Sequence, residues 1–339
     1  MAILMIVIKR WVVSLYITEQ GVYMNKQTIY YKNDEEMQNI IKEKQRNINI
    51  IKVPMYLSLV GLLLPFVSVI FDIYGPTINI VFRTVPVVCI VIGFLLSILC
   101  NKKMNDLREF IGQNIVLGIL EERIQVIDYM PSGYVNESFL KECTILPNYN
   151  SVAGSDYIHG IYRNVEFTYS DLELKLESQD YTANDNNMKT TITEFSGQFI
   201  TVSLSKIVNG SVQIMGKNGS RKSHREKKSL SRYENNNELT CLETGNHVFD
   251  DRFDVIATDN DLVYSILTPQ FISGLKKMGK RTSIQISGNM AVIACNNEKN
   301  SFELKRQIKD NSDVELCRQE FRKELSDILA ILDIVIDDL

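Results

Sequence analysis

Two long apolar runs dominate the hydrophobic pattern near the start of the chain. Residues 53–73 carry no charge before Asp72, and residues 78–100 carry only Arg83. Each run is long enough to cross about 30 Å of hydrocarbon as a helix. A buried helical hairpin in a soluble domain is the alternative, but the short link at residues 74–77 would require an unusually large core around both helices. The pattern therefore predicts a two-helix transmembrane hairpin.

Basic residues flank the two runs and are nearly absent between them. They are Lys42, Lys44, Arg46 and Lys52 before the first run, and Lys102, Lys103 and Arg108 after the second. Because lysine and arginine stay on the cytoplasmic side, the chain is predicted to be a multi-pass protein of the cell (inner) membrane with cytoplasmic N- and C-termini. Asp72 and Arg83 are expected at the outer interface, with a functional pair inside the membrane as the alternative.

Amphipathic helices are predicted on both sides of the hairpin. The first helix lies within residues 24–52 and has its N-cap at Asn33. Pro54 is suited to start the first membrane helix. The second amphipathic helix, residues 103–127, follows the second apolar run. The apolar stripes consist of Met37, Ile40, Ile41, Ile48 and Ile51 in the first helix and Leu107, Phe110, Ile111, Ile115, Ile119 and Leu120 in the second. We expect the two helices to pair and to extend the hairpin into the cytosol.

Beyond residue 150 the pattern changes from helical to alternating. Residues 157–178 predict a β-hairpin with its turn at Arg163-Asn164. Strands at 193–207 and 211–216 predict a second hairpin through Asn209-Gly210. Further strands are predicted at 238–243, 253–258, 282–287 and 290–296, the last two joined by Gly288-Asn289. The fold class is therefore α+β, with an antiparallel sheet and flanking helices after the hairpin.

The acids of residues 253–269 have the spacing of helix caps. Thr258 with Asp261 predicts a capping box, and Thr268 before Pro269 predicts an N-cap with proline at the first helical position. Gly279 predicts the end of that helix. A cation site at Asp259 and Asp261 is the alternative, but a calcium loop needs alternating ligands with a glycine at the bend.

The end of the chain predicts an amphipathic helix that opens with Ser312 and Glu315 as a capping box. Its apolar stripe is Val314, Cys317, Phe321, Leu325, Ile328, Leu332 and Val335. The segment is too short and too interrupted by Asp333 for a third span. We expect it either to pack on the sheet or to pair with a second copy in a homo-oligomer.

These elements divide the chain into segments. Residues 1–23 are interpreted as an upstream mis-start before Met24, an anchor or an extra strand, since they lack the length of a span and a signal-peptide cleavage site. The remaining segments are a cytosolic helix (24–52), the transmembrane hairpin (53–100), a membrane-proximal helix and linker (101–150), the antiparallel α+β domain (151–310) and the C-terminal helix (311–339).

Composition narrows the classes of function. The 339 residues are 45% hydrophobic, which is enough for one or two domains with a core and excludes disorder. A net charge of -4 and a pI near 5.6 argue against nucleic acid as a partner. The cysteines show no metal-ligand spacing and are interpreted as reduced thiols. No metal or cofactor is predicted.

Enzyme motifs are not found. His159, His224 and His247 lie far apart without a motif partner, and residues 216–223 lack the glycine spacing of a phosphate loop. One dense basic run remains, and its cations are Arg221, Lys222, Arg225, Lys227, Lys228 and Arg232. A solvated loop is one interpretation, and contact with anionic lipid headgroups is the other.

The ordered blocks "YIHGIYRNVEFTYSDLEL", "FSGQFITVSL", "ELTCLE", "FDDRFDVIATDNDLVYSILTPQF" and "ISGNMAVIACNNEKNSFE", with the closing acidic helix, resemble a known bacterial family, domain of unknown function 3137. The resemblance covers roughly residues 30–338. It implies two early membrane spans before such a domain and no established activity. Family members carry Ala-Arg-Tyr where this chain has Leu262, Val263 and Tyr264, so any role of that arginine is absent.

Three function hypotheses follow. The first is a two-pass membrane protein whose cytosolic domain is a binding or scaffold module for an unknown protein partner, with the lipid bilayer and anionic headgroups as further partners. The second is a membrane-tethered enzyme whose acids, such as Asp250, Asp251 and Asp254, are brought together by the fold. The third is an accessory subunit of a membrane transporter.

Overall fold

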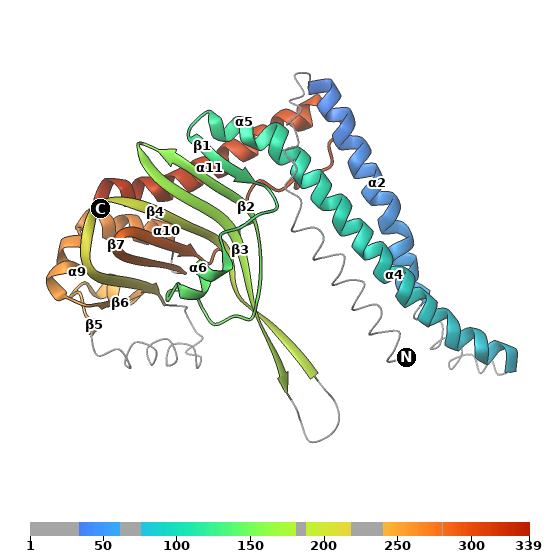
Figure 1. The fold of residues 1–339 in the computed structure, drawn as a ribbon, viewed down its shortest axis with the longest axis horizontal. Helices are drawn as coiled ribbons and strands as arrows, with labels where there is room; N and C mark the ends of the chain where they lie inside the picture. Colours follow the sequence, from blue (N-terminus) through green and yellow to red (C-terminus); the bar gives the residue numbers. More distant parts are fainter. Residues whose placement is uncertain (1–33, 62–75, 181–187, 218–239, 280) are drawn as a thin grey trace. The chain divides into compact units, whose positions relative to one another are not determined.

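Figure 1 shows the fold in a computed structural model of the chain. The structure describes residues 34–61, 76–180, 188–217, 240–279 and 281–339. The chain divides into two units, Met1–Lys32 and Asn33–Leu339, and every described residue lies in the second. The interpretation of residues 1–23 and the N-cap at Asn33 lie outside the described residues.

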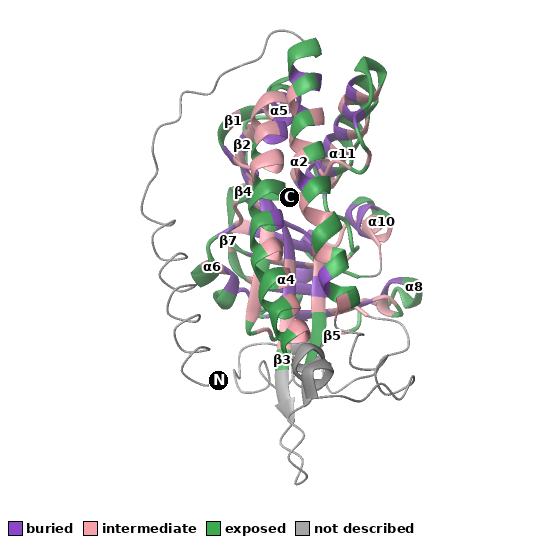
Figure 2. Ribbon diagram, turned by 90° about the vertical axis from the view of Figure 1, so that its right-hand side faces the viewer, coloured by how far each residue is buried: buried purple, intermediate pink, exposed green. Residues whose placement is uncertain are grey.

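Two long helices, α2 (Asp34–Gly61) and α4 (Pro76–Ile111), lie side by side (Figures 1 and 2). Pro54, which is suited to start a helix, instead lies inside α2. A proline removes only one backbone donor, and a long helix packed along a neighbour can continue through that loss.

One helix in the described part of the chain, Thr84–Glu121, is long and apolar enough to cross a membrane. Only 6% of its most apolar window is buried, which separates it from the core helix of a soluble domain. The first predicted span, residues 53–73, is described only as far as Gly61. The two-helix hairpin therefore stays a prediction.

Beyond α4 the helical path continues through a π-helix, η1 (Gly112–Val116), and a short helix, α5 (Leu117–Glu121). The amide groups of Arg123 and Ile124 both donate to the carbonyl of Leu120 and close the helix. The chain then forms strand β1 (Gln125–Met130). The prediction of a helix to residue 127 is wrong at this end, because β1 gains backbone partners on the edge of the sheet.

Within the described residues, seven strands form one antiparallel sheet of order β1-β2-β3-β4-β6-β5, with β7 also paired to β4. The strands after β1 are β2 (Ser151–Tyr162), β3 (Val165–Asp180), β4 (Met188–Gly216), β5 (Thr240–Leu242), β6 (Phe253–Ala257) and β7 (Thr282–Cys295). The α+β class with an antiparallel sheet is confirmed. The predicted turn between β2 and β3 is also confirmed, since Arg163 and Asn164 have φ of 52° and 64°.

The turns predicted at Asn209-Gly210 and Gly288-Asn289 are both wrong. Strands β4 and β7 run through these positions and pair with each other on both sides of them. Gly210 and Gly288 do have positive φ, 119° and 58°. Because each glycine is paired within a long strand, the chain does not reverse there. The pairing register of β4 and β7 shifts around these positions instead.

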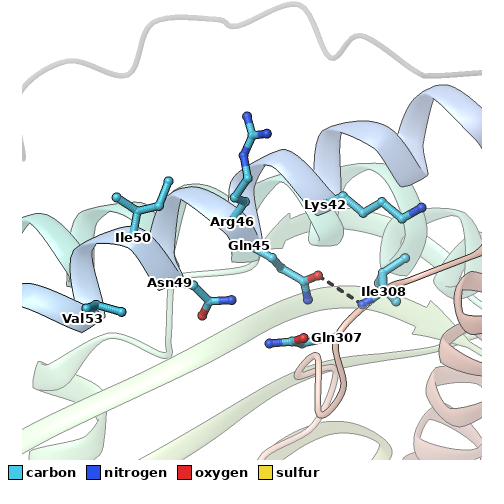
Figure 3. Close-up of a pocket in the computed structure, with 8 residues that line it drawn as sticks. All are labelled: Lys42, Gln45, Arg46, Asn49, Ile50, Val53, Gln307 and Ile308. Atoms are coloured by element: carbon cyan, nitrogen blue, oxygen red, sulfur yellow. Dashed lines mark hydrogen bonds between the residues drawn. The ribbon is translucent and has the colours of Figure 1, made fainter. Parts of the chain in front are cut away.

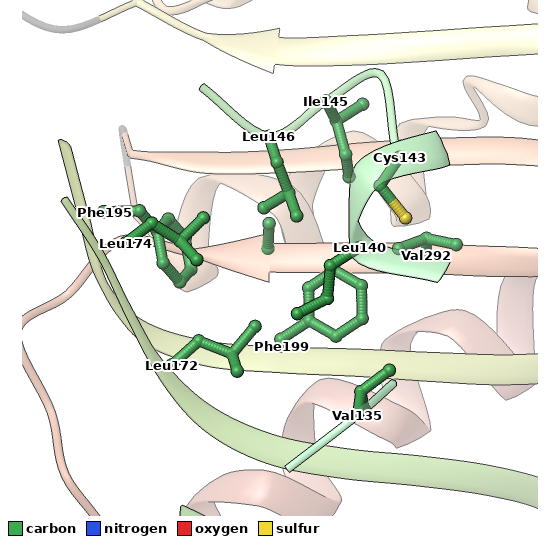
Figure 4. Close-up of a cluster of buried hydrophobic side chains, with 11 residues drawn as sticks. Val135, Leu140, Cys143, Ile145, Leu146, Leu172, Leu174, Phe195, Phe199 and Val292 are labelled. Carbon is green, nitrogen blue, oxygen red and sulfur yellow. The ribbon is translucent and has the colours of Figure 1, made fainter. Parts of the chain in front are cut away.

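Both faces of the sheet are covered (Figures 1 and 2). On one face, the segment around helix α6 (Glu137–Glu142) inserts Leu140, Cys143 and Ile145 into a buried cluster with Phe199 and Val292 of the sheet (Figure 4). The ring of Phe139 meets Phe199 edge to face at 6.3 Å between centroids. These contacts anchor the segment between β1 and β2 on the sheet.

Helices α10 (Pro269–Met278) and α11 (Asn311–Asp338) cover the other face. They pack closely, since a Cβ on Gly274 would lie 2.4 Å from Ile334 Cγ2. The predicted C-terminal helix is confirmed, and its whole stripe from Val314 to Val335 is buried within the chain.

The helix caps predicted from the sequence are confirmed in part. The hydroxyl of Thr268 accepts from Phe271 N at 3.1 Å and Gly279 ends α10, as predicted. Helix α9 (Asn260–Ile266) is capped by Asp259, so the predicted capping box at Thr258 is wrong. The hydroxyl of Thr258 instead accepts from Ser211 N, where β4 passes β6. Helix α11 is capped by Asp310 with Asp313, so the predicted box at Ser312 and Glu315 is wrong.

The cap at Thr268 gives the first prediction. Thr268→Ala removes the acceptor for Phe271 N and should lower the free energy of unfolding by about 1 kcal/mol. Thr268→Ser keeps the acceptor and should stay near wild type. Thermal unfolding of the three full-length proteins in detergent would test this, and an alanine variant as stable as the serine variant would contradict it.

Candidate functional site

The candidate site lies where the end of α4 meets the sheet, and it begins at the π-helix η1. A Cβ on Gly112 would lie 2.3 Å from Pro131 Cγ and 3.1 Å from Tyr129 Oη, so only glycine fits here without displacing its neighbours. π-Helical turns inside α-helices are frequent at functional sites. The contact places the backbone of η1 directly against Tyr129.

Tyr129 leads to a buried carboxyl group. Its hydroxyl donates to Asp156 Oδ1 at 3.0 Å, and Asp156 is only 1% exposed. Asp156 lies at the register shift of β2, with a φ of 54° that aspartate tolerates better than most residues. Its Oδ2 is buried and has no hydrogen-bond partner among the described residues. Burial raises the pKa of Asp156 to about 7, against the opposing charge of Arg108.

A second buried carboxyl group, Asp171, lies on β3. Its Oδ1 accepts from the hydroxyl of Tyr169 at 2.8 Å, and its Oδ2 accepts from Ser301 N at 2.7 Å. Burial raises the pKa of Asp171 to about 7, and the charge of Asp156 adds to the effect. The hydroxyls of Tyr169 and Ser301 also bond each other at 2.8 Å. Asp171 therefore fixes the backbone at Ser301 to the sheet.

Residues 296–310, between β7 and α11, are called here the connecting segment. Asn297 Nδ2 donates to Gln198 Oε1 on β4 at 2.9 Å, and Phe302 N donates to Glu324 Oε2 on α11 at 2.7 Å. Glu303 forms an ion pair with Arg108 of α4. The connecting segment is thus held to the sheet, to α11 and to α4 within a few residues.

Ion pairs add a second set of ties between the helices. The guanidinium of Arg318 on α11 bonds both carboxylate oxygens of Asp34 at the start of α2, at 2.6 and 3.0 Å. Arg322 forms a similar bidentate pair with Glu122 after α5. These pairs are exposed and each contributes little alone, but their two-point geometry sets the orientation of α11.

The chemistry that the site supports is proton exchange near neutral pH. Asp156 and Asp171 each have a pKa of about 7, mainly because they are buried, and a charge on Asp156 further raises the pKa of Asp171. Gain or loss of a proton changes bonds to Tyr129 and to Ser301. Among the residues the structure describes, no group of three His, Cys, Asp or Glu side chains could hold a metal ion. The network is therefore a proton-sensitive tie between α4, the sheet and the connecting segment.

The residues predicted from the sequence lie elsewhere. The basic run from Arg221 to Arg232 and His224 lie outside the described residues, so the headgroup contact remains untested. His159 bonds Glu166 on the hairpin at 2.7 Å. His247 begins a short helix, α8 (His247–Asp250).

The proposed catalytic acids mostly have structural partners. The carboxylate of Asp250 accepts from both the amide and the hydroxyl of Thr244, at 3.2 and 2.6 Å. Asp254 pairs with Lys217 at 2.9 Å. Asp251 is exposed at the end of α8. The enzyme hypothesis therefore gains no support from these three residues.

Sequence reasoning missed Asp156 and Asp171, although one signal was present. Val165, Phe167 and Tyr169 alternate along β3, and Asp171 occupies the next position in the same period. An acid that continues a core-facing stripe predicts a buried carboxyl group. Asp156 has no such signal, because it lies at a register shift that the sequence does not show.

Comparison with known families identifies part of the chain. Residues 193–336 match the model of the family described as Protein of unknown function (DUF3137). This region, less than half of the chain, is similar to DUF3137. The predicted resemblance is confirmed over this range, which begins in β4 and ends in α11. Ser301, Glu303 and Glu324 belong to the DUF3137 match, whereas Asp156 and Asp171 precede it.

Other comparisons add little. The crystal structure of the mycobacterial trehalose monomycolate transport factor A, TtfA, is 11% identical and covers 66% of this chain and 97% of its own, with a TM-score of 0.30. A score this low supports no conclusion about the DUF3137 domain. No curated protein matches the chain.

The buried carboxyl groups give the second prediction. The pKa of Asp156 is about 7 in the folded state, and its ordinary value is 3.8. Between these two pH values the folded state keeps a proton on Asp156 that the unfolded state has already released. Stability should therefore fall as pH rises from 4 to 7 and level off above 7. Asp156→Asn cannot ionise and should lose stability less steeply over this range.

Thermal midpoints between pH 4 and 8 would measure the effect. Asp259→Asn is the matched control, since asparagine also caps a helix well, and it should follow the wild-type slope. An Asp156→Asn slope equal to that of wild type would contradict the account.

Proposed function

We propose that this chain is a two-pass membrane protein whose DUF3137 domain acts as a cytosolic binding or scaffold module. The observation that carries the proposal is the exposed apolar surface of α4. Val87, Ile90, Phe94 and Leu95 are each about half exposed or more, although all are large and apolar. A patch of this extent marks a surface that another phase or molecule covers, and its length matches a bilayer.

The pairing of α2 with α4 supports a hairpin of two spans. A Cβ on Gly61 would lie 2.4 Å from Cys89 Sγ, and one on Gly93 would lie 2.6 Å from Ser58 Oγ. Small residues at such contacts let helix backbones approach closely, which is typical of membrane helices. The outward side chains of α2 at this level, including Tyr56 and Leu57, are also exposed.

Basic residues at both ends support the proposed orientation of the hairpin in the membrane. Lys102 and Lys103 of α4 are exposed just beyond its apolar stretch, and Arg46 precedes the apolar part of α2. Lysine and arginine in these flanks favour a cytoplasmic location for both ends of the hairpin. The DUF3137 domain, which follows α4, then lies in the cytoplasm.

The contacts at the junction support a module held in a defined position rather than a freely tethered domain. The Arg108–Glu303 pair, the Gly112–Tyr129 contact and the Arg322–Glu122 pair all tie the extension of α4 to the rest of the structure. A binding surface on the domain would therefore keep a fixed orientation relative to the membrane. The basic run from Arg221 to Arg232 is proposed to add contacts with anionic headgroups.

Topology gives the third prediction. A fluorescent protein fused after Lys103 or Leu339 should fluoresce, because both positions are expected in the cytoplasm. Alkaline phosphatase inserted at Gly75 should be active, because that position is expected outside. Active phosphatase at Leu339 would contradict the proposal.

The scaffold hypothesis gives the fourth prediction. Chemical cross-linking in membranes should recover the same partner protein with wild type and with Asp251→Asn, since a binding module does not need that acid for catalysis. Arg108→Glu reverses the charge facing Glu303 and should reduce recovery by about ten-fold, because the domain then loses its fixed orientation. Recovery of no fixed partner from any of the three proteins would contradict the scaffold function.

A further inference from the structure

A shallow groove of about 390 Å³ runs along α2 and has residues 307–308 of the connecting segment as its other wall (Figure 3). It is separate from the buried carboxyl network, because neither Asp156 nor Asp171 lines it. We call it the α2 groove.

The wall of the α2 groove is held in place by one side chain. Gln45 Nε2 donates to the carbonyl of Arg306 at 3.2 Å, and Gln45 Oε1 accepts from Ile308 N at 3.1 Å. This double contact pairs the amide with the backbone of the connecting segment, as Figure 3 shows for the bond to Ile308. The two sides of the groove therefore keep their spacing.

Polarity changes along the groove in one direction. Lys42 and Arg46 are one helical turn apart and supply positive charge at one end. Asn49 follows, and Ile50 and Val53 then line the end nearest the apolar part of α2, with 61% and 60% of their surfaces exposed. Figure 3 shows Lys42 directed toward Ile308, with Arg46 on the outer side of α2.

The positive charges of Lys42 and Arg46 are only partly compensated by neighbouring acidic groups. Hydrogen bonds from the Ser312 hydroxyl and from the backbone of Asp313 lower the pKa of Asp310, the cap of α11, and the charge of Lys42 adds a smaller effect in the same direction. Arg46 has no ion pair or hydrogen bond from its guanidinium within the described residues. An exposed cation beside amide groups and an apolar shelf is suited to a ligand that is anionic at one end and apolar at the other.

We propose that the α2 groove binds an anionic phospholipid, with the phosphate near Lys42 and Arg46, the polar linkage at Asn49 and an acyl chain along Ile50 and Val53. The proposal rests on the proposed function, because the apolar end must meet the bilayer. Charge complementarity and the polar-to-apolar order along α2 select this ligand over a soluble peptide. The bound lipid would bridge α2 and the connecting segment, which carries Ser301 and Glu303.

The test uses the full-length protein in detergent with added dioleoylphosphatidylglycerol, dioleoylphosphatidylcholine or inorganic phosphate. Phosphatidylglycerol should raise the thermal midpoint, and the other two should not. In Lys42→Gln/Arg46→Gln the half-saturating concentration of phosphatidylglycerol should rise about 25-fold, since each of the two cations near an anionic headgroup contributes a factor of about five.

One control variant removes charge at another place. Lys102→Gln/Lys103→Gln removes the same charge from α4 at the membrane boundary and should bind phosphatidylglycerol like wild type. If the Lys42/Arg46 variant fails to fold, Gln307→Glu serves instead, because it places a carboxylate on the opposite wall and should weaken binding.

Three results would overturn the assignment. Equal phosphatidylglycerol binding by wild type and the groove variants would show that the headgroup lies elsewhere. An equal rise in midpoint with inorganic phosphate would show a site for free phosphate instead of lipid. Loss of binding in the Lys102/Lys103 control would show an unspecific charge effect. If the topology reporters agree with two spans but the groove variants bind normally, only this assignment fails and the proposed function stands.

Discussion

The carboxyl group of Asp156 lies in the interior with one oxygen bonded to Tyr129 and the other without a partner among the described residues. Burying an ionised carboxylate in this way is costly, so the group keeps its proton up to about neutral pH. The surrounding structure depends on this constraint. Gly112 brings the end of α4 against Tyr129, and Arg108 faces the same acid from α4.

The network extends from this acid to the C-terminal part of the chain. Asp171 holds the backbone of Ser301, and the next two residues of the connecting segment contact α11 and α4. The DUF3137 match contains the connecting segment and most of α11 but begins after β3. In this chain the matched region is therefore bonded to residues that precede the match, among them the strands that carry both acids. This arrangement makes the tie between α4, the sheet and the connecting segment sensitive to protonation.

Sequence reasoning predicts the elements that local rules determine. Asn and Arg in the β2–β3 turn, Thr268 before Pro269, and the stripe from Val314 to Val335 each act through neighbours a few residues away, and each prediction is confirmed. The errors fall where a distant partner decides. Gly210 and Gly288 have the backbone of turn residues, but pairing between β4 and β7 keeps both strands continuous. Strand β1 forms because β2 offers an edge, and the helical stripe before it does not reveal that edge.

The candidate site was harder to predict for the same reason. Asp171 continues the core-facing period of β3, but its partner Ser301 is 130 residues away. The Gly112–Pro131 contact and the left-handed backbone of Asp156 require the assembled fold. The apolar runs and their basic flanks, in contrast, are properties of composition over about twenty residues, so the sequence alone shows them, whereas the two-helix hairpin stays a prediction.

Hydrogen–deuterium exchange on the full chain in lipid nanodiscs tests the central claim most directly. Protection factors, corrected for the intrinsic pH dependence of exchange, would be compared at pH 6 and pH 8 for segments 125–131, 155–172 and 299–304. If the buried carboxyl groups tie α4, the sheet and the connecting segment together, these three segments should lose protection jointly at pH 8 in wild type and much less in Asp156→Asn. Protection that changes in only one segment, or equally in wild type and variant, would contradict the account.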